Sequence, residues 1–246
     1  YYADRIYQIN LAIAGIAIGT IILPNLSKNV QSQDKSKITL IQNKALELSL
    51  FLSLPATMAL MIAPTEITSA LFGYGEFDIL SVNNSAKALF YFAIGLPAFS
   101  IIKIFSSFLF ARHNTRIPFY FSLISVIINI IISLYFFKDV GFIIIPIATT
   151  ISSWINCLLL FIYLKNNKYF SIELNLVKSL IKIFISTTIT SILFYNLVSY
   201  FSNKLNFESE YKLLVIILLV TITFVTYIII SILTKAFKIS DIKLKY

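Results

Sequence analysis

The sequence predicts an all-α fold: a polytopic membrane bundle of seven transmembrane helices. Of its 246 residues, 58% are hydrophobic and 13% are charged, whereas a soluble domain is about 45–50% apolar and about 25% charged. The mean hydropathy is +0.87, and a soluble globule of this size cannot bury so much apolar surface. The apolar residues also run continuously, whereas the strands of a membrane barrel alternate in polarity over about 10 residues.

The individual spans follow from the lengths of the apolar runs, since a helix needs about 20 residues to cross about 30 Å of hydrocarbon. Polar connections such as residues 28–44 and 165–178 separate the runs. The predicted spans are residues 5–26, 45–63, 86–110, 117–137, 141–164, 179–201 and 212–234.

Proline marks predicted bends in these spans. Pro55, Pro97 and Pro146 fall inside spans, where proline removes a helical hydrogen bond and favours a kink. Gly95 precedes Pro97 by two residues and strengthens the prediction of a hinge there. Kinked helices with polar residues are typical of transporters that work by alternating access.

Basic residues gather on one side of the predicted bilayer. The connections after the first, third and fifth spans and the C-terminal tail hold most of the 20 Lys and Arg residues. The opposite connections are acidic, and their basic residues are Lys87, Lys138, Lys204 and Lys212. Because Lys and Arg collect in cytoplasmic loops, the C-terminus is expected in the cytoplasm and Tyr1 outside. A start outside without a targeting segment also predicts that an N-terminal part of the protein is missing.

Several function classes are excluded at this level. The net charge of +9 does not predict nucleic-acid binding, because no basic patch is interleaved with polar stacking residues. His113 is the only histidine, and the sequence has no phosphate-binding loop, nucleophile elbow or paired-Asp metal motif. The single cysteine, Cys157, lies in an apolar run and is expected to pack there. We expect no cofactor, no metal and no ATP hydrolysis.

Ionisable residues inside the spans are the first candidates for function, because burying each costs about 2.5–3.5 kcal/mol on insertion scales. Lys103 lies about nine residues from Arg112, too deep for easy snorkelling. We expect it to line a polar cavity, with a structural ion pair as the alternative. Glu47 follows Lys44 by three residues and is interpreted as an interfacial or paired residue.

The first span opens with a polar stripe. Arg5, Gln8 and Ala12 share one helical face. A guanidinium facing a water-filled cavity would suit bidentate binding of a phosphate-containing head group. We therefore predict substrate binding by Arg5, Asp4 and Gln8, together with Lys103. The alternative is that Asp4 only neutralises Arg5.

Polar residues in the fourth and fifth spans form a second candidate region. Asn129 and Ser133 lie one turn apart in the fourth span, and Thr149 lies in the fifth. In a membrane such residues most often hydrogen-bond neighbouring helices. The alternative is an ion site, although neutral oxygens bind a hard cation only weakly without a carboxylate.

Four segments together resemble one known family. They are YYADRIYQINLAIAGIAIGTIILPNLS at the start, FGYGEF at 72–77, ALFYFAIGLPAFSIIKIFSSFLFARHNTRIP at 88–118 and ATTISSWINCLLL at 148–160. They are similar to the MurJ (MviN) lipid II flippases of the MATE-like, MOP exporter superfamily. The resemblance covers most of residues 1–165, and the last two spans match only in hydropathy and position.

The resemblance implies the eighth to fourteenth spans of a fourteen-span transporter. Residues 1–164 would supply five helices of its C-terminal lobe. Residues 165–246 would supply two further helices and a cytoplasmic tail, with a groove at 179–234 for the undecaprenyl tail. Such proteins move lipid II to the outer leaflet of the bacterial inner membrane by alternating access, without ATP hydrolysis. The implied partners are lipid II, membrane lipids and the missing N-terminal lobe.

The resemblance also bears on individual residues. It implies that Arg5 faces the substrate in a cationic cavity. Some family members have a sodium site formed by an Asn and a carboxylate one turn apart; Asn129 fits, but Ser133 replaces the acidic residue, so sodium binding is not predicted.

Other functions remain open from the residues alone. The nearest is a polysaccharide repeat-unit flippase or a drug exporter of the same superfamily. A membrane-embedded enzyme acting on polyprenyl phosphates would need a carboxylate pair or a histidine at a membrane face. A non-transporting scaffold would not need Lys103 deep in a span.

Overall fold

Helices make up nearly all of the structure, a computed structural model that describes residues 1–12 and 18–236. No strand occurs in this described part. In chain order the helices are α1 (Tyr2–Leu11), α2 (Ile18–Gln31), α3 (Lys35–Ile62), α4 (Pro64–Phe72), α5 (Ile79–Phe110), α6 (Arg116–Val140), α7 (Ile144–Asn166), α8 (Leu174–Tyr200), α9 (Ser202–Leu205) and α10 (Lys212–Leu233). A short 3₁₀ turn, Gly141–Ile143, joins α6 to α7.

The predicted all-α membrane bundle is confirmed, but the count of seven spans is not. Five segments of the described chain are long and apolar enough to cross a membrane, and one of them, Arg116–Asn166, contains both α6 and α7. The residues of the first predicted span are divided between α1 and α2, each too short to cross alone. Residues 13–17, which connect these two helices in the chain, lie outside the described residues.

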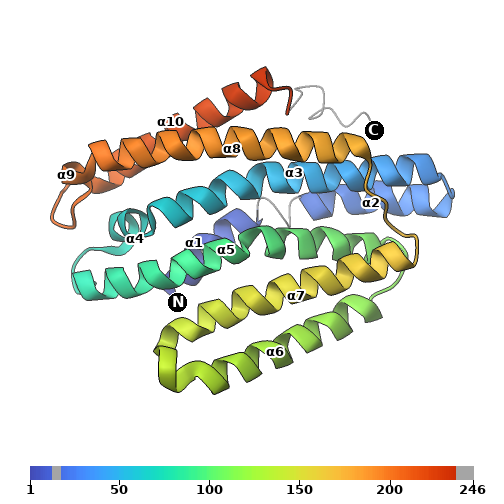
Figure 1. Cartoon of the computed structure of the whole chain (residues 1–246), viewed down its shortest axis with the longest axis horizontal. Coiled ribbons are helices and arrows are strands. Elements are labelled where there is room, and N and C mark those ends of the chain that lie inside the picture. Colours follow the sequence, from blue (N-terminus) through green and yellow to red (C-terminus); the bar gives the residue numbers. More distant parts are fainter. Residues whose placement is uncertain (13–17, 237–246) are drawn as a thin grey trace.

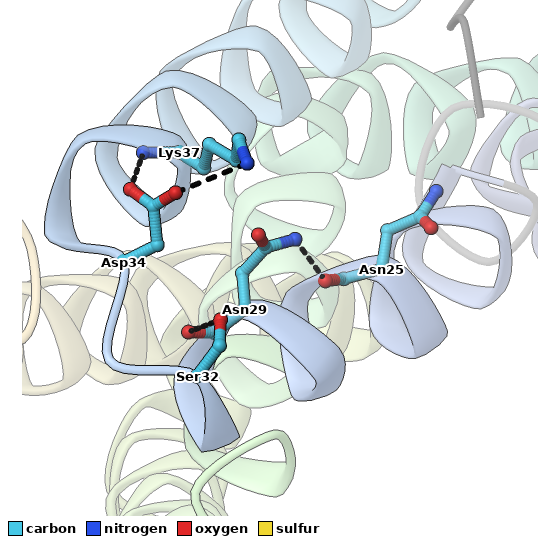
Figure 2. A network of polar contacts seen from close by, with 5 residues as sticks. All are labelled: Asn25, Asn29, Ser32, Asp34 and Lys37. Carbon is cyan, nitrogen blue, oxygen red and sulfur yellow. Dashed lines mark hydrogen bonds and ion pairs between the residues drawn. The ribbon is translucent and has the colours of Figure 1, made fainter.

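The helices extend beyond the apolar runs where a side chain caps them. α3 begins ten residues before the predicted span, because the Asp34 carboxylate accepts a hydrogen bond of 3.1 Å from the Lys37 amide and pairs with the Lys37 ammonium at 3.2 Å. These bonds hold the pKa of Asp34 below its ordinary value. Figure 2 also shows how α2 ends, with the Asn29 amide donating to the Asn25 carbonyl and the Ser32 hydroxyl to the Asn29 carbonyl.

The long helices pack side by side in the order α6, α7, α5, α3, α8, α10, with α1 and α2 against α3 and α5 (Figure 1). α6 forms one edge and has only Pro118 and Ser125 buried, as expected for a helix that faces lipid. α8 and α10 lie at the opposite edge. Two apolar clusters fill the two ends of the central helices.

α5 and α7 are in close contact at Gly95. A Cβ atom there would lie 2.9 Å from the Thr150 hydroxyl oxygen. α7 donates two hydrogen bonds to carbonyls of α5 in this region, from Thr150 to Tyr91 at 2.7 Å and from Trp154 to Ile94 at 3.2 Å. The small residue is therefore needed for packing, and the predicted hinge at Gly95 and Pro97 stays a prediction.

The kink predicted at Pro146 is wrong. This proline lies in the first turn of α7, which begins at Ile144, and not in the middle of a helix. Helix amides in the first turn have no carbonyl partner within the helix, so proline removes no bond there. Pro55 and Pro97 do lie inside α3 and α5, which both continue through them.

The connection between α7 and α8 is fixed to the body of the bundle. The Tyr169 carbonyl accepts from Gln42 and Arg112, both at 3.0 Å. Asn43 donates to the Ser171 carbonyl at 2.9 Å and accepts from the Glu173 amide at 3.1 Å. Phe170 is buried among the aromatic rings of α5 and α7. These contacts set the position of α8 against α3.

Candidate functional site

Helix α1 presents three different faces, and the candidate site begins there. Ala3 is buried, and the Tyr7 ring stacks on Phe92 and Phe99 of α5 at 4.9 and 5.4 Å between centroids. The predicted polar stripe of Arg5, Gln8 and Ala12 lies on another side of the helix. Ile6 and Ile9 lie next to that stripe and line an apolar pocket.

Arg5 is exposed and makes only weak contacts within the described residues. Its guanidinium donates to the Gln8 side-chain oxygen at 3.3 Å and lies 4.8 Å from the centroid of the Tyr1 ring. The neighbouring Asp4 forms no ion pair with it in the described part of the chain; its carboxylate accepts from the Gln8 amide instead. The guanidinium therefore keeps most of its donors for a ligand.

Lys103 is also exposed, although it lies well inside α5. It shares a face of this helix with Phe92 and Phe99, the rings that α1 covers, and lies about 6 Å beyond Phe99 along the axis. Its ammonium forms no ion pair within the described residues, so the structural ion pair considered as the alternative is not seen there. Arg5 and Lys103 thus belong to the same α1–α5 side of the bundle.

The second candidate region is a set of contacts between α6 and α7. Asn129 donates to the Thr149 hydroxyl at 3.0 Å, and that hydroxyl donates to the Ile145 carbonyl at 2.8 Å. Ser133 does not join them; its buried hydroxyl has no hydrogen-bond partner in the described part. Among the described residues no group of three or more His, Cys, Asp or Glu side chains could hold a metal ion. The arrangement is that of helix–helix hydrogen bonding in a membrane.

An apolar pocket of about 470 Å³ lies between α1, α3, α4, α8 and α10. Its wall includes Pro55 and Leu60 of α3, Phe194 of α8, and Phe224 and Tyr227 of α10. Thr190, Ser191, Thr221 and Thr223 are the other residues with polar side chains that line it besides Tyr227. No single run of the sequence indicates this pocket, because five separate elements form it.

Lys212 is a residue whose surroundings the sequence did not reveal. The sequence places it at the start of the last predicted span, on the side with few basic residues, and only 2% of it is exposed at the start of α10. Its ammonium donates to the carbonyls of Gly73 at 2.7 Å and Phe207 at 2.6 Å, and lies 4.4 Å from the Tyr74 ring centroid. The position of Lys212 opposite the FGYGEF segment could not be read from hydropathy.

Glu47 behaves as interpreted. Its carboxylate pairs with the Lys44 ammonium at 2.9 Å, three residues earlier on α3. This ion pair explains the presence of an acidic residue near the end of a span, and no functional role of Glu47 is needed.

Comparison with known proteins identifies the family of this chain. The family model described as "Lipid II flippase MurJ" matches residues 1–216. This chain belongs to the MurJ family. The match continues through α8 into α10, beyond the four segments that carry the sequence resemblance.

Named MurJ relatives agree with this assignment. The chain is 36% identical over 213 residues to a probable lipid II flippase MurJ of Rickettsia prowazekii. The aligned region covers 87% of this chain and 42% of that protein. It is 39% identical over 160 residues to the corresponding protein of Rhizobium meliloti, covering 65% of this chain and 30% of that one. The chain therefore spans less than half the length of these MurJ relatives.

A solved structure is also similar. It is titled "Lipid II flippase MurJ, inward closed conformation", with a TM-score of 0.72 and 25% identity, covering 95% of this chain and 46% of that one. The chain is thus a multi-pass membrane protein with the helical architecture of part of MurJ.

Proposed function

We propose that this chain is the C-terminal portion of a lipid II flippase, which moves the undecaprenyl-linked peptidoglycan precursor across the bacterial inner membrane by alternating access. The observation that carries the proposal is the arrangement of α1. Arg5 and Gln8 lie on its polar face, and Ile6 and Ile9 on the adjacent face line the apolar pocket. One helix therefore presents a cation and an apolar wall side by side, as an amphiphile with an anionic head and an isoprenoid tail requires.

The head group would be bound by cations of the α1–α5 side. A guanidinium offers paired donors to the oxygens of a pyrophosphate. Arg5 has these donors largely free within the described residues, and Gln8 and Asp4 orient it through a short chain of hydrogen bonds. Lys103 would add a second positive charge further along α5. A phosphate that leaves Arg5 would therefore still be attracted by a cation.

The tail would occupy the apolar pocket. Its volume of about 470 Å³ is that of a site for a drug-sized ligand, so only a segment of a long polyprenyl chain would fit and the remainder would lie in lipid. α8 and α10 supply much of its wall, in agreement with the groove expected at residues 179–234. The proposed division at residue 165 separates the helices that carry the candidate head-group residues Arg5 and Lys103 from the two helices that supply much of this wall.

The test is complementation of a flippase-depleted bacterium by the complete gene. The wild-type gene should restore growth, and Arg5→Ala should fail at equal membrane levels. A hydrogen bond to a charged group contributes about 1.5–3 kcal/mol. Its loss corresponds to roughly a ten- to hundredfold loss of head-group affinity. Arg5→Lys should rescue partly, because it keeps the charge but not the bidentate geometry.

A matched pair on α5 controls for general loss of positive charge. Lys103→Ala should impair growth, whereas Lys87→Ala, an exposed lysine near the start of the same helix, should not. If Arg5→Ala restores growth when it is present in the membrane at the wild-type level, Arg5 is not part of the head-group site. Failure of a well-expressed wild-type protein would overturn lipid II as the substrate and favour a polysaccharide repeat unit.

A further inference from the structure

The hydrogen-bond ladder of α3 is incomplete at Pro55, and a residue of α10 completes it. In an α-helix each amide donates to the carbonyl four residues earlier, but proline has no N–H. Pro55 therefore cannot donate to the Phe51 carbonyl. The Tyr227 hydroxyl donates to that carbonyl at 2.8 Å, across 176 residues of sequence.

The same contact fixes the Tyr227 ring in one place. Its centroid lies 5.0 Å from that of the Phe51 ring, with 34° between the ring planes. Only 1% of Tyr227 is exposed. A buried phenol is held both by its ring and by its hydroxyl, and the hydroxyl would be costly to bury without a partner. Phenylalanine or leucine would fill the space without this second attachment.

Tyr227 stands at one end of the apolar pocket. The pocket wall follows α10 from Ile216 to Tyr227 and α3 from Leu52 to Ile62, so Tyr227 and Leu52 mark the same end. Beyond this end Ile183 packs with Phe51 and Tyr227 in a buried apolar cluster and is itself fully buried. Ser231, one turn further along α10, is also fully buried.

We propose that Tyr227 is the end wall of the pocket and determines how many isoprene units of a bound polyprenyl chain it accepts. The nature of the occupant rests on the proposed function. The position of the wall rests on the hydrogen bond to Phe51 and on the buried Ile183 that packs behind the ring. Tyr227 thus selects chain length within the pocket, while α1 selects the head group.

The experiment measures binding of polyprenyl phosphates with increasing numbers of isoprene units to the purified full-length protein. In the wild type, affinity should rise with chain length and then level off once the pocket is filled. Tyr227→Ala should move this plateau to chains at least one isoprene unit longer. The control is Phe224→Ala, which removes a ring from the side wall one turn earlier and should weaken all chains without moving the plateau.

The outcomes separate this inference from the proposed function. If affinity in the wild type does not depend on chain length, the pocket does not hold the tail and that part of the proposed function is wrong. If the wild type shows a plateau that Tyr227→Ala leaves in place, the end wall is wrong and the tail assignment stands.

A second measurement tests the hydrogen bond itself and does not need a ligand. Pro55→Ala restores an amide that can donate to the Phe51 carbonyl, which makes the Tyr227 hydroxyl redundant. Tyr227→Phe should therefore lower the midpoint of thermal unfolding more in the wild-type background than in the Pro55→Ala background. Equal losses in the two backgrounds would show that the hydroxyl does not compensate for the proline.

Discussion

Arg5 and Lys212 lie at the same end of the bundle but in different surroundings. Tyr2 of α1 contacts Phe72 and Phe77, and Lys212 contacts the carbonyl of Gly73 between them. Arg5 is exposed, with a neutral side chain and a ring as neighbours. Lys212 is buried and satisfied by carbonyls and rings, without an ion pair in the described part of the chain. Because its guanidinium is exposed and largely unbonded within the described residues, Arg5 and not the buried Lys212 is the candidate for ligand binding.

Lys212 is predicted to stabilise the fold. Lys212→Met keeps the length of the apolar stem but removes the hydrogen bonds to Gly73 and Phe207. Hydrogen bonds to charged groups contribute about 1.5–3 kcal/mol, so the free energy of unfolding should fall by about that amount. Thermal unfolding of the full-length protein in detergent measures the change.

The exposed Lys204 provides the control. Its contact is a ring at 5.8 Å, so Lys204→Met should leave the unfolding midpoint nearly unchanged. Equal effects of the two substitutions would mean that burial of Lys212 contributes nothing specific.

At the scale of elements, the connection between α7 and α8 decides where the last two long helices lie. Arg112 directly follows the end of α5. Its guanidinium donates to the Phe108 carbonyl at 2.8 Å and to the Tyr169 carbonyl at 3.0 Å. Its guanidinium also lies 4.8 Å from the centroid of the Tyr169 ring. Burial lowers the pKa of Arg112, a shift that the neighbouring Tyr169 opposes, and arginine still remains charged at neutral pH.

Arg112→Ala should therefore loosen α8 and α10 from the rest of the bundle. We expect a loss of about 1.5–3 kcal/mol in unfolding free energy and faster proteolysis within residues 167–173. Arg112→Lys should not restore the wild-type value, because one ammonium cannot reproduce the fork and the ring contact. Limited proteolysis and thermal unfolding of the full-length protein check both expectations.

Arg116 is the matched control for this prediction. It is an exposed arginine at the start of α6, four residues further along the chain. Arg116→Ala should leave both measurements close to wild type. A similar loss in this variant would assign the effect to net charge and not to the connection.

At the scale of the whole molecule, orientation in the membrane remains a prediction from charge. Most basic residues lie on the side of the α2–α3, α5–α6 and α7–α8 connections, so that side should be cytoplasmic together with the C-terminus. A fluorescent reporter fused after Tyr246 should fold and fluoresce, whereas alkaline phosphatase fused there should be inactive.

Fusion after Phe207, in the connection before α10, is the internal control. It lies across one span from the C-terminus, so the two reporters should behave in the opposite way. Reversal of this pattern at both sites would overturn the predicted orientation.

The candidate site was predictable only in part. Arg5, Gln8 and Lys103 stood out because polar groups in apolar runs are costly wherever the chain folds. The exposure of these side chains, and the pairing of Asn129 with Thr149, depend on which helices are neighbours. Only the one-turn spacing joins Ser133 to Asn129, and the structure leaves Ser133 outside that contact.

The fold class, the approximate positions of the long helices and the family follow from the amino-acid sequence alone, because apolar run length and local motifs are properties of consecutive residues. Which residues from distant helices meet depends on the packing of the bundle. The pocket between five elements, the burial of Lys212 and the bond from Tyr227 to Phe51 all join segments far apart in the chain. Hydropathy along one helix carries no information about its neighbours, so only the packed bundle places these residues together.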